Sequence, residues 1–164
     1  MDTPACLCPD HVRRAAAPDA ARAAPADAAY DSLLLSCIDP RMVAPVFHYM
    51  RRRGLDGRYS QVSLAGAALG VEAPAFAAWR QTFWENLDAS ITLHRITRVI
   101  AINHQDCGAA RIAYGAESVA MAETERRLHQ RVLTAFKAEV AKRYPGLRVE
   151  GLFMALDGEV TAID

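Results

Sequence analysis

Short apolar runs alternate along the chain with longer segments in which apolar residues recur every three or four positions. Residues 32–38 and 98–103 are mostly apolar and of strand length, a pattern typical of strands buried on both faces of a parallel sheet. A further strand is predicted at 59–64. Two more, at 147–155 and 159–163, flank the turn signal Asp-Gly near the end of the chain.

Three segments have helical patterns. Residues 74–93 carry aromatic and aliphatic side chains at three- and four-residue spacings, with Pro74 in the first turn. A long helix is expected from about 118 to 144, closed by Pro145, and a short helix from about 45 to 53. Strands that alternate with helices predict an α/β fold with a largely parallel central β-sheet flanked by helices.

Composition favours one domain and excludes some partners. The 164 residues are 52% hydrophobic and 23% charged, as in an ordinary globular domain. Nineteen basic and nineteen acidic side chains cancel, so we expect no binding to nucleic acid or to an anionic membrane surface. The apolar runs are much shorter than the roughly 20 residues of a membrane helix, so no membrane partner is expected.

The start of the chain differs in character from the rest. Residues 1–30 are alanine-rich and broken by Pro18 and Pro25, which predicts an N-terminal arm, while residues 31–164 form the α/β domain. The arm has no continuous apolar core of a secretory signal, so we expect a cytoplasmic protein. The chain has four cysteines, too few for a disulfide scaffold, and we expect reduced thiols or metal ligands.

Metal-competent side chains follow both of the buried strands. Cys37 ends the first run, and His104 and Cys107 come directly after the strand at 98–103. Ligand sites in open α/β sheets collect at the carboxyl ends of strands, so these side chains are expected to meet. Two cysteines and one histidine are the ligand set of a zinc site that keeps its fourth position open. Alternatively, a single cysteine in such a strand packs as a small buried hydrophobe.

An acidic and a basic residue accompany this cluster. Asp39 can accept a hydrogen bond from a zinc-bound hydroxide or serve as the fourth zinc ligand, and Arg41 can hold it away through a bidentate pair. The plainer interpretation is that Asp39 caps a helix entered through Pro40. Cys107 precedes Gly108 and is expected near a helix N-terminus, where the dipole favours a thiolate.

A second metal site is conceivable in the arm, where Cys6, Cys8 and His11 fall within six positions. The neighbouring sequence offers no obvious fourth protein ligand. This favours the interpretation that these three residues do not bind a metal ion. The remaining histidines are His48, His94 and His129. They have no metal-ligand spacing, so we interpret them as surface residues or as core residues with satisfied hydrogen bonds and do not count them as ligand candidates.

The two motifs together resemble the paired signature of β-class carbonic anhydrases, over about residues 33 to 160. By this resemblance the zinc ligands are Cys37, His104 and Cys107, and the catalytic dyad is Asp39 with Arg41. The resemblance also implies reversible hydration of carbon dioxide to bicarbonate by a zinc-bound hydroxide, and a homodimer or higher homo-oligomer.

The chain departs from that family at two places. Ser63-Leu64 stands where many members have Arg-Asn before an alanine-glycine turn, and no glutamine precedes Gln61, whereas plant-type members have one upstream of the first cysteine. Two alternatives therefore stay open. One is a hydrolase of carbonyl sulfide or carbon disulfide that uses the same site, and the other is a non-catalytic, zinc-stabilised binding protein.

Overall fold

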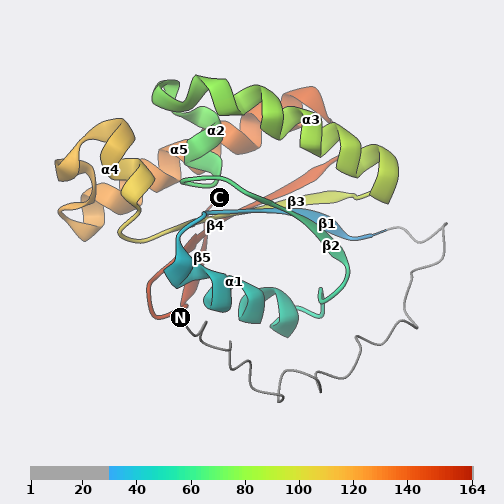
Figure 1. The fold of residues 1–164 in the computed structure, drawn as a ribbon, viewed down its shortest axis with the longest axis horizontal. Helices are drawn as coiled ribbons and strands as arrows, with labels where there is room; N and C mark the ends of the chain where they lie inside the picture. Colours follow the sequence, from blue (N-terminus) through green and yellow to red (C-terminus); the bar gives the residue numbers. More distant parts are fainter. Residues whose placement is uncertain (1–29, 164) are drawn as a thin grey trace, which may run out of the picture.

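A five-stranded sheet with the strand order β2-β1-β3-β4-β5 forms the centre of the computed structural model, which describes residues 30–163 (Figure 1). Four strands are parallel, and β5 joins β4 antiparallel. The strands are β1 (Ser32–Ser36), β2 (Tyr59–Ser63), β3 (Arg98–His104), β4 (Arg148–Met154) and β5 (Val160–Ile163). The predicted fold class, a largely parallel sheet flanked by helices, is confirmed.

Helices cover both faces of this sheet (Figure 1). One face is covered by α1, whereas α2, α3 and α5 lie on the other. The α-helices are α1 (Pro40–Arg52), α2 (Ala68–Glu72), α3 (Ala77–His94), α4 (Gly108–Tyr114) and α5 (Ala122–Arg143), and the short 3-10 helices are η2 (Pro74–Phe76) and η3 (Ala116–Val119). In the part of the chain that the structure describes, no helix has an apolar stretch long enough to span a lipid bilayer.

Strand β1 shows why both faces need a helical layer. Successive side chains of a strand point to opposite faces. Leu33 and Leu35 therefore enter the core formed with α3 and α5, while Leu34 enters the core formed with α1. All three are essentially inaccessible to solvent, so the apolar run that predicted a doubly buried strand is explained by a sheet covered on both sides.

Helix α1 begins earlier than the sequence pattern predicted. It starts at Pro40 rather than near Pro45, because the Asp39 carboxylate accepts the Arg41 amide hydrogen at 2.9 Å and so caps the helix. Proline suits this first helical position, where its missing N–H has no partner to lose. Pro45 then lies inside the helix, and its use as a start signal was wrong.

Helices α3 and α5, in contrast, begin later than the sequence pattern predicted. The helix expected from residue 118 begins at Ala122, because Gly115 has a φ of 89° and residues 116–119 form the separate turn η3. The helix expected from residue 74 begins with the 3-10 turn η2 and becomes α-helical only at Ala77. Short 3-10 turns at helix starts leave the hydrophobic spacing almost unchanged, so the pattern alone could not reveal them.

Candidate metal centre

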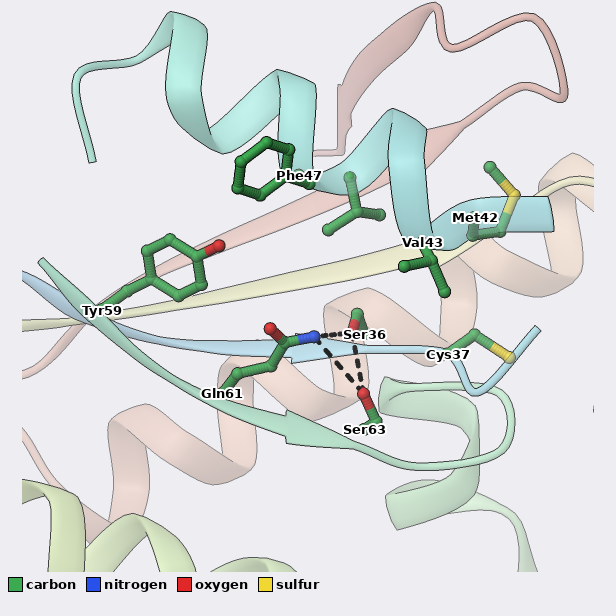
Figure 2. Close-up of a pocket in the computed structure, with 9 residues that line it drawn as sticks. Ser36, Cys37, Met42, Val43, Phe47, Tyr59, Gln61 and Ser63 are labelled. Carbon is green, nitrogen blue, oxygen red and sulfur yellow. Dashed lines mark hydrogen bonds between the residues drawn. The ribbon is translucent and has the colours of Figure 1, made fainter. Parts of the chain in front are cut away.

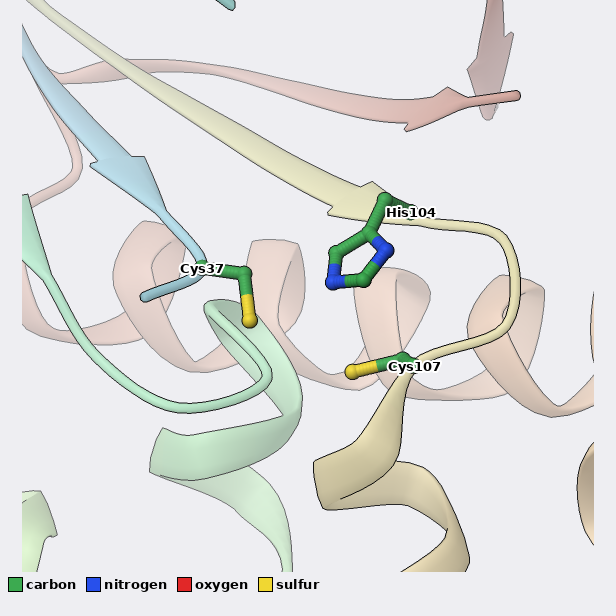
Figure 3. A group of neighbouring side chains, drawn as sticks. All are labelled: Cys37, His104 and Cys107. Carbon is green, nitrogen blue, oxygen red and sulfur yellow. The ribbon is translucent and has the colours of Figure 1, made fainter. Parts of the chain in front are cut away.

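Three buried side chains converge at the carboxyl ends of β1 and β3 (Figure 3). Cys37 follows β1, His104 is the last residue of β3, and Cys107 is the N-cap of α4. One ligand atom from each lies within 4.8 Å of those of the other two. β1 and β3 are parallel neighbours, so their ends reach the same edge of the sheet, and the predicted meeting of these three residues is confirmed.

The histidine of this cluster presents a free nitrogen. His104 Nδ1 lies 2.8 Å from the Gln105 carbonyl oxygen, to which it donates, so the proton resides on Nδ1. Nε2 then carries the lone pair, is fully buried, and has no hydrogen-bond partner. A buried nitrogen without a partner is costly, and a metal ion bound to Nε2 would satisfy it.

Glycine at position 66 supports the first sulfur. The Gly66 N–H donates to Cys37 Sγ at 3.2 Å. Gly66 has a φ of 82°, and a Cβ there would lie 3.1 Å from the Ala109 Cβ, so only glycine brings this amide close without strain. Two sulfurs and one imidazole nitrogen are the donors that zinc prefers, and the residues present therefore fit a three-ligand zinc site.

The charge of the cluster also suits a cation. A hydrogen bond from the Cys107 thiol, helped by His104 and the Gly66 amide, lowers the pKa of Cys37. The adjacent Cys37 sulfur, together with burial, raises the pKa of Cys107. Burial lowers the pKa of His104, but contact with Cys37 outweighs it and the net change is upward. One of the two sulfurs, that of Cys37, is thus favoured as the thiolate, which is the form of cysteine that binds a metal ion.

Asp39 and Arg41 form the ion pair that the sequence predicted. Arg41 Nη2 lies 2.7 Å from Asp39 Oδ2, and its Nε lies 3.0 Å from Oδ1. This guanidinium lowers the pKa of Asp39 to about 2. Asp39 Oδ2 is also 4.0 Å from His104 Nε2, so the carboxylate lies beside the cluster while it caps α1. The interpretation of Asp39 as a helix cap is confirmed, and its role towards a zinc-bound hydroxide or as a zinc ligand stays a prediction.

A second acidic residue fixes the other end of this arginine. Arg41 Nη1 binds Asp106 Oδ2 at 2.9 Å, and Nη2 donates to the Asp106 carbonyl oxygen at 2.9 Å. Asp106 lies in the loop between two of the candidate ligands, so Arg41 joins the start of α1 to that loop. No local sequence pattern predicts this contact, because the two residues are 65 positions apart.

Two buried polar residues of α5 lie beneath the same loop. Glu125 is 3% exposed, and its Oε1 accepts the amide hydrogens of Asp106 at 2.6 Å and Cys107 at 3.3 Å. Burial raises the pKa of this carboxyl group. His129 is a core residue, as expected, but only its Nδ1 has a partner. The available signal was an acid at helical spacing with the apolar residue Leu128, on the buried face of a predicted helix.

A pocket of about 190 Å³ adjoins Cys37 between α1 and the β2 edge of the sheet (Figure 2). Its apolar side is formed by α1, including Val43 and Phe47. On the polar side, the Gln61 amide nitrogen donates to Ser36 Oγ at 3.2 Å and Ser63 Oγ at 3.4 Å. Ser63, at a position where many members of the family have arginine, contributes its hydroxyl to this polar cluster.

The sequence also offered a second candidate metal site in the N-terminal arm. Cys6, Cys8 and His11 are outside the described residues, as is the predicted arm up to residue 29. Their proposed second site therefore stays a prediction.

Solved structures with this fold are β-carbonic anhydrases. A tetrameric β-carbonic anhydrase from Sordaria macrospora matches with a TM-score of 0.57 and 15% sequence identity, over 83% of this chain and 81% of that one. The β-carbonic anhydrase CafA of Aspergillus fumigatus matches with a TM-score of 0.55 and 16% identity, over 84% of this chain and 76% of that one. At such low identities the likeness defines the fold, which is that of the β-carbonic anhydrases.

Sequence comparison defines the family. Residues 29–164 match the model of a family described as "Putative carbonic anhydrase", and the chain belongs to this family. An uncharacterized protein of Rickettsia conorii is 30% identical over 132 residues, which cover 80% of this chain and 71% of the relative. An uncharacterized protein of Rickettsia bellii is 29% identical over 132 residues, which cover 80% of each chain.

Proposed function

We propose that this protein is a zinc-dependent carbonic anhydrase that interconverts carbon dioxide and bicarbonate. The observation that carries the proposal is the buried cluster of Cys37, His104 and Cys107, in which the lone pair of His104 Nε2 has no protein partner. These three side chains would hold the zinc ion, which would supply an acidified water as the nucleophile for hydration. Membership of the carbonic anhydrase family supports this choice of reaction.

Asp39 and Arg41 act together in this proposal. The Asp39 carboxylate is ionised near neutral pH because Arg41 depresses its pKa to about 2, so it accepts a hydrogen bond and does not act as an acid. The bidentate contact with Arg41 restrains Asp39 close to the cluster. Asp39 therefore orients the attacking water and receives its hydrogen bond, and Arg41 keeps Asp39 from becoming a ligand.

The pocket beside Cys37 has the chemistry that a small, linear, apolar gas requires. Val43 and Phe47 provide apolar contact, and the hydroxyls of Ser36 and Ser63 provide polar groups at the opposite side. Gln61 follows the first cysteine in the sequence, unlike the upstream glutamine of plant-type enzymes. Its amide nitrogen donates to both hydroxyl oxygens, so we assign Gln61 the orientation of these hydroxyls, which can donate to a substrate oxygen.

Stopped-flow measurement of carbon dioxide hydration by the zinc-loaded protein tests this proposal. We expect turnover that rises from neutral to alkaline pH, because two thiolates cancel the formal charge of zinc and acidify a bound water less than three histidines would. Parallel assays with carbonyl sulfide and carbon disulfide identify the preferred gas. Zinc-loaded protein without hydration of any of the three gases would contradict catalysis and favour a zinc-stabilised binding protein.

We also infer that the active form is a homodimer or a higher homo-oligomer. Ile38, Val43 and Phe47 are 61%, 66% and 43% exposed, and Val43 and Phe47 also line the pocket beside Cys37. Exposed apolar side chains beside a site are typical of an interface, and β2 is an edge strand of the sheet. A second copy of the chain is the partner that the tetrameric Sordaria macrospora structure supports.

Sedimentation velocity provides the measurement for this assembly. The protein is expected to sediment with at least twice the mass of one chain. Phe47→Glu is expected to shift it towards the monomer, because a carboxylate would lose its hydration in the interface. Met121→Glu is the matched control, since Met121 is 67% exposed at the N-terminus of α5, and it should leave the mass unchanged. A wild-type monomer at micromolar concentration would contradict the inference.

A further inference from the structure

Glu125 is a buried acidic residue whose contacts go to the backbone of the metal loop, residues 104–107. Its Oε1 accepts two amide hydrogens, from Asp106 at 2.6 Å and from Cys107 at 3.3 Å. The side chain comes from α5, which packs against the sheet on the opposite side from α1. Glu125 on α5 thereby holds the metal loop, which begins at the end of β3.

The loop needs this support because its conformation is unusual. Asp106 has a φ of 54°, in the left-handed region that costs a non-glycine residue energy. The two amides that bind Glu125 flank this residue, so the carboxylate fixes the peptide planes on both sides of the strained position. The direction of the Cys107 side chain follows from the same backbone, since Cys107 is the next residue and caps α4.

His129 and Asn103 support Glu125 from within the core. Asn103 Oδ1 accepts the Ala68 amide hydrogen at 3.1 Å, so its amide nitrogen must donate to His129 Nδ1, at 2.9 Å. The remaining proton of the neutral imidazole is therefore on Nε2. His129 Nε2 has no hydrogen-bond partner and lies 3.9 Å from Glu125 Oε1.

This arrangement is not that of an ordinary structural ion pair. Among residues 30–163, no arginine or lysine forms a salt bridge with Glu125, and His129 Nε2 lies 3.9 Å from its Oε1. A buried carboxylate without a cationic partner is costly to maintain. The two hydrogen bonds to the metal loop offset the free-energy cost of burying the carboxylate. This arrangement indicates that Glu125 has a role in that loop.

We propose that Glu125 is a positioning residue for the metal centre, which holds the loop so that Cys107 Sγ faces Cys37 and His104 before the metal ion binds. The inference rests on the metal site of the proposed function but not on the substrate. The role requires hydrogen-bond acceptance by Glu125 and no direct contact with the metal ion.

Three substitutions test this role. Glu125→Leu removes the acceptor and keeps an apolar group of similar size in the core, and Glu125→Ala serves the same purpose if the leucine variant does not fold. Glu125→Gln retains a carbonyl oxygen that accepts both amide hydrogens. Glu123→Ala is the matched control, because Glu123 lies on the same helix with its side chain 62% exposed and paired only with Arg127 among the described residues.

The readouts are zinc affinity, measured by competition with a chelator, and the absorption spectrum of the cobalt-substituted protein, which reports thiolate ligands and coordination geometry. Glu125→Leu is expected to weaken zinc binding by about 10–100-fold and to alter the cobalt spectrum. Glu125→Gln should remain within a few-fold of the wild type and keep its spectrum. Glu123→Ala should be indistinguishable from the wild type.

Either of two results would overturn the role of Glu125. One is wild-type zinc affinity and an unchanged cobalt spectrum in Glu125→Leu or Glu125→Ala. The other is a glutamine variant as impaired as the leucine variant, since hydrogen-bond acceptance would then not be what matters. A wild-type protein that binds cobalt through two thiolates but does not hydrate carbon dioxide would overturn the proposed reaction and leave Glu125 in its role. Failure of the wild-type protein to bind cobalt would overturn both.

Discussion

Replacing Cys107 by serine is expected to release the metal ion and to lower kcat/KM for carbon dioxide hydration by more than about 100-fold, the upper end of what loss of an outer-shell contact costs. Serine is nearly isosteric with cysteine, but its hydroxyl is a poor zinc ligand near neutral pH. Cys107 is completely buried at the N-terminus of α4, so no other side chain can readily take its place. Zinc content by mass spectrometry and stopped-flow kinetics provide the measurements.

The double variant Cys37→Ser/Cys107→Ser controls for unrelated effects. Ligands of one metal ion act as a unit, so we expect the double variant to be no less active than either single variant. Circular dichroism should show the same helix content in all three proteins. Cys107→Ser protein that retains one zinc ion per chain and wild-type kinetics would show that the sulfur is a packing group, the plainer interpretation of a buried cysteine.

Asp39→Asn is expected to retain zinc but to lower kcat by about 10–100-fold, the range typical of a lost contact that orients a metal-bound group. Asparagine keeps the oxygen that caps α1, so the helix should remain intact. The charge that pairs with Arg41 is lost, and the attacking water then has no carboxylate to accept its hydrogen bond. The measurements are kcat over a range of pH values and the zinc content of the purified protein.

Loss of zinc from the Asp39→Asn variant would assign Asp39 a different role. If zinc retention falls together with activity, Asp39 is a fourth zinc ligand and the site is closed, as in structural zinc sites. Asp157→Asn is the control, because Asp157 is an exposed residue in the β4–β5 turn, where its carboxylate accepts the Glu159 amide hydrogen. That variant should show wild-type zinc content and wild-type kcat.

The principal residues of the site could be predicted because the physics that determines them is local. Apolar runs identify β1 and β3 as buried strands, and parallel neighbours place their carboxyl ends together, so residues 37 and 104 had to lie close. Cys107 follows His104 after a loop of two residues, and Asp39 and Arg41 follow Cys37 by two and four residues. Among these five positions, only the pairing of β1 with β3 joins distant parts of the chain.

The residues that surround the ligands could not be predicted, because their contacts depend on tertiary packing. Glu125 reaches the metal loop only through the docking of α5, and the sequence gives no register for that contact. Gln61 enters the pocket because β2 pairs with β1 so that Gln61 lies opposite Leu34. Either strand could slip by two residues without changing its apolar pattern, so the pairing is visible only in the structure.

The most direct measurement of the metal centre is a crystal structure of the zinc-loaded protein with diffraction data collected at the zinc absorption edge. One anomalous peak per chain is expected, bound by the sulfurs of Cys37 and Cys107 and by His104 Nε2, with a water molecule in the fourth position and Asp39 paired with Arg41. A peak at another place in the molecule, or no peak, would contradict the metal centre. A peak with Asp39 as the fourth ligand would contradict the open, catalytic site.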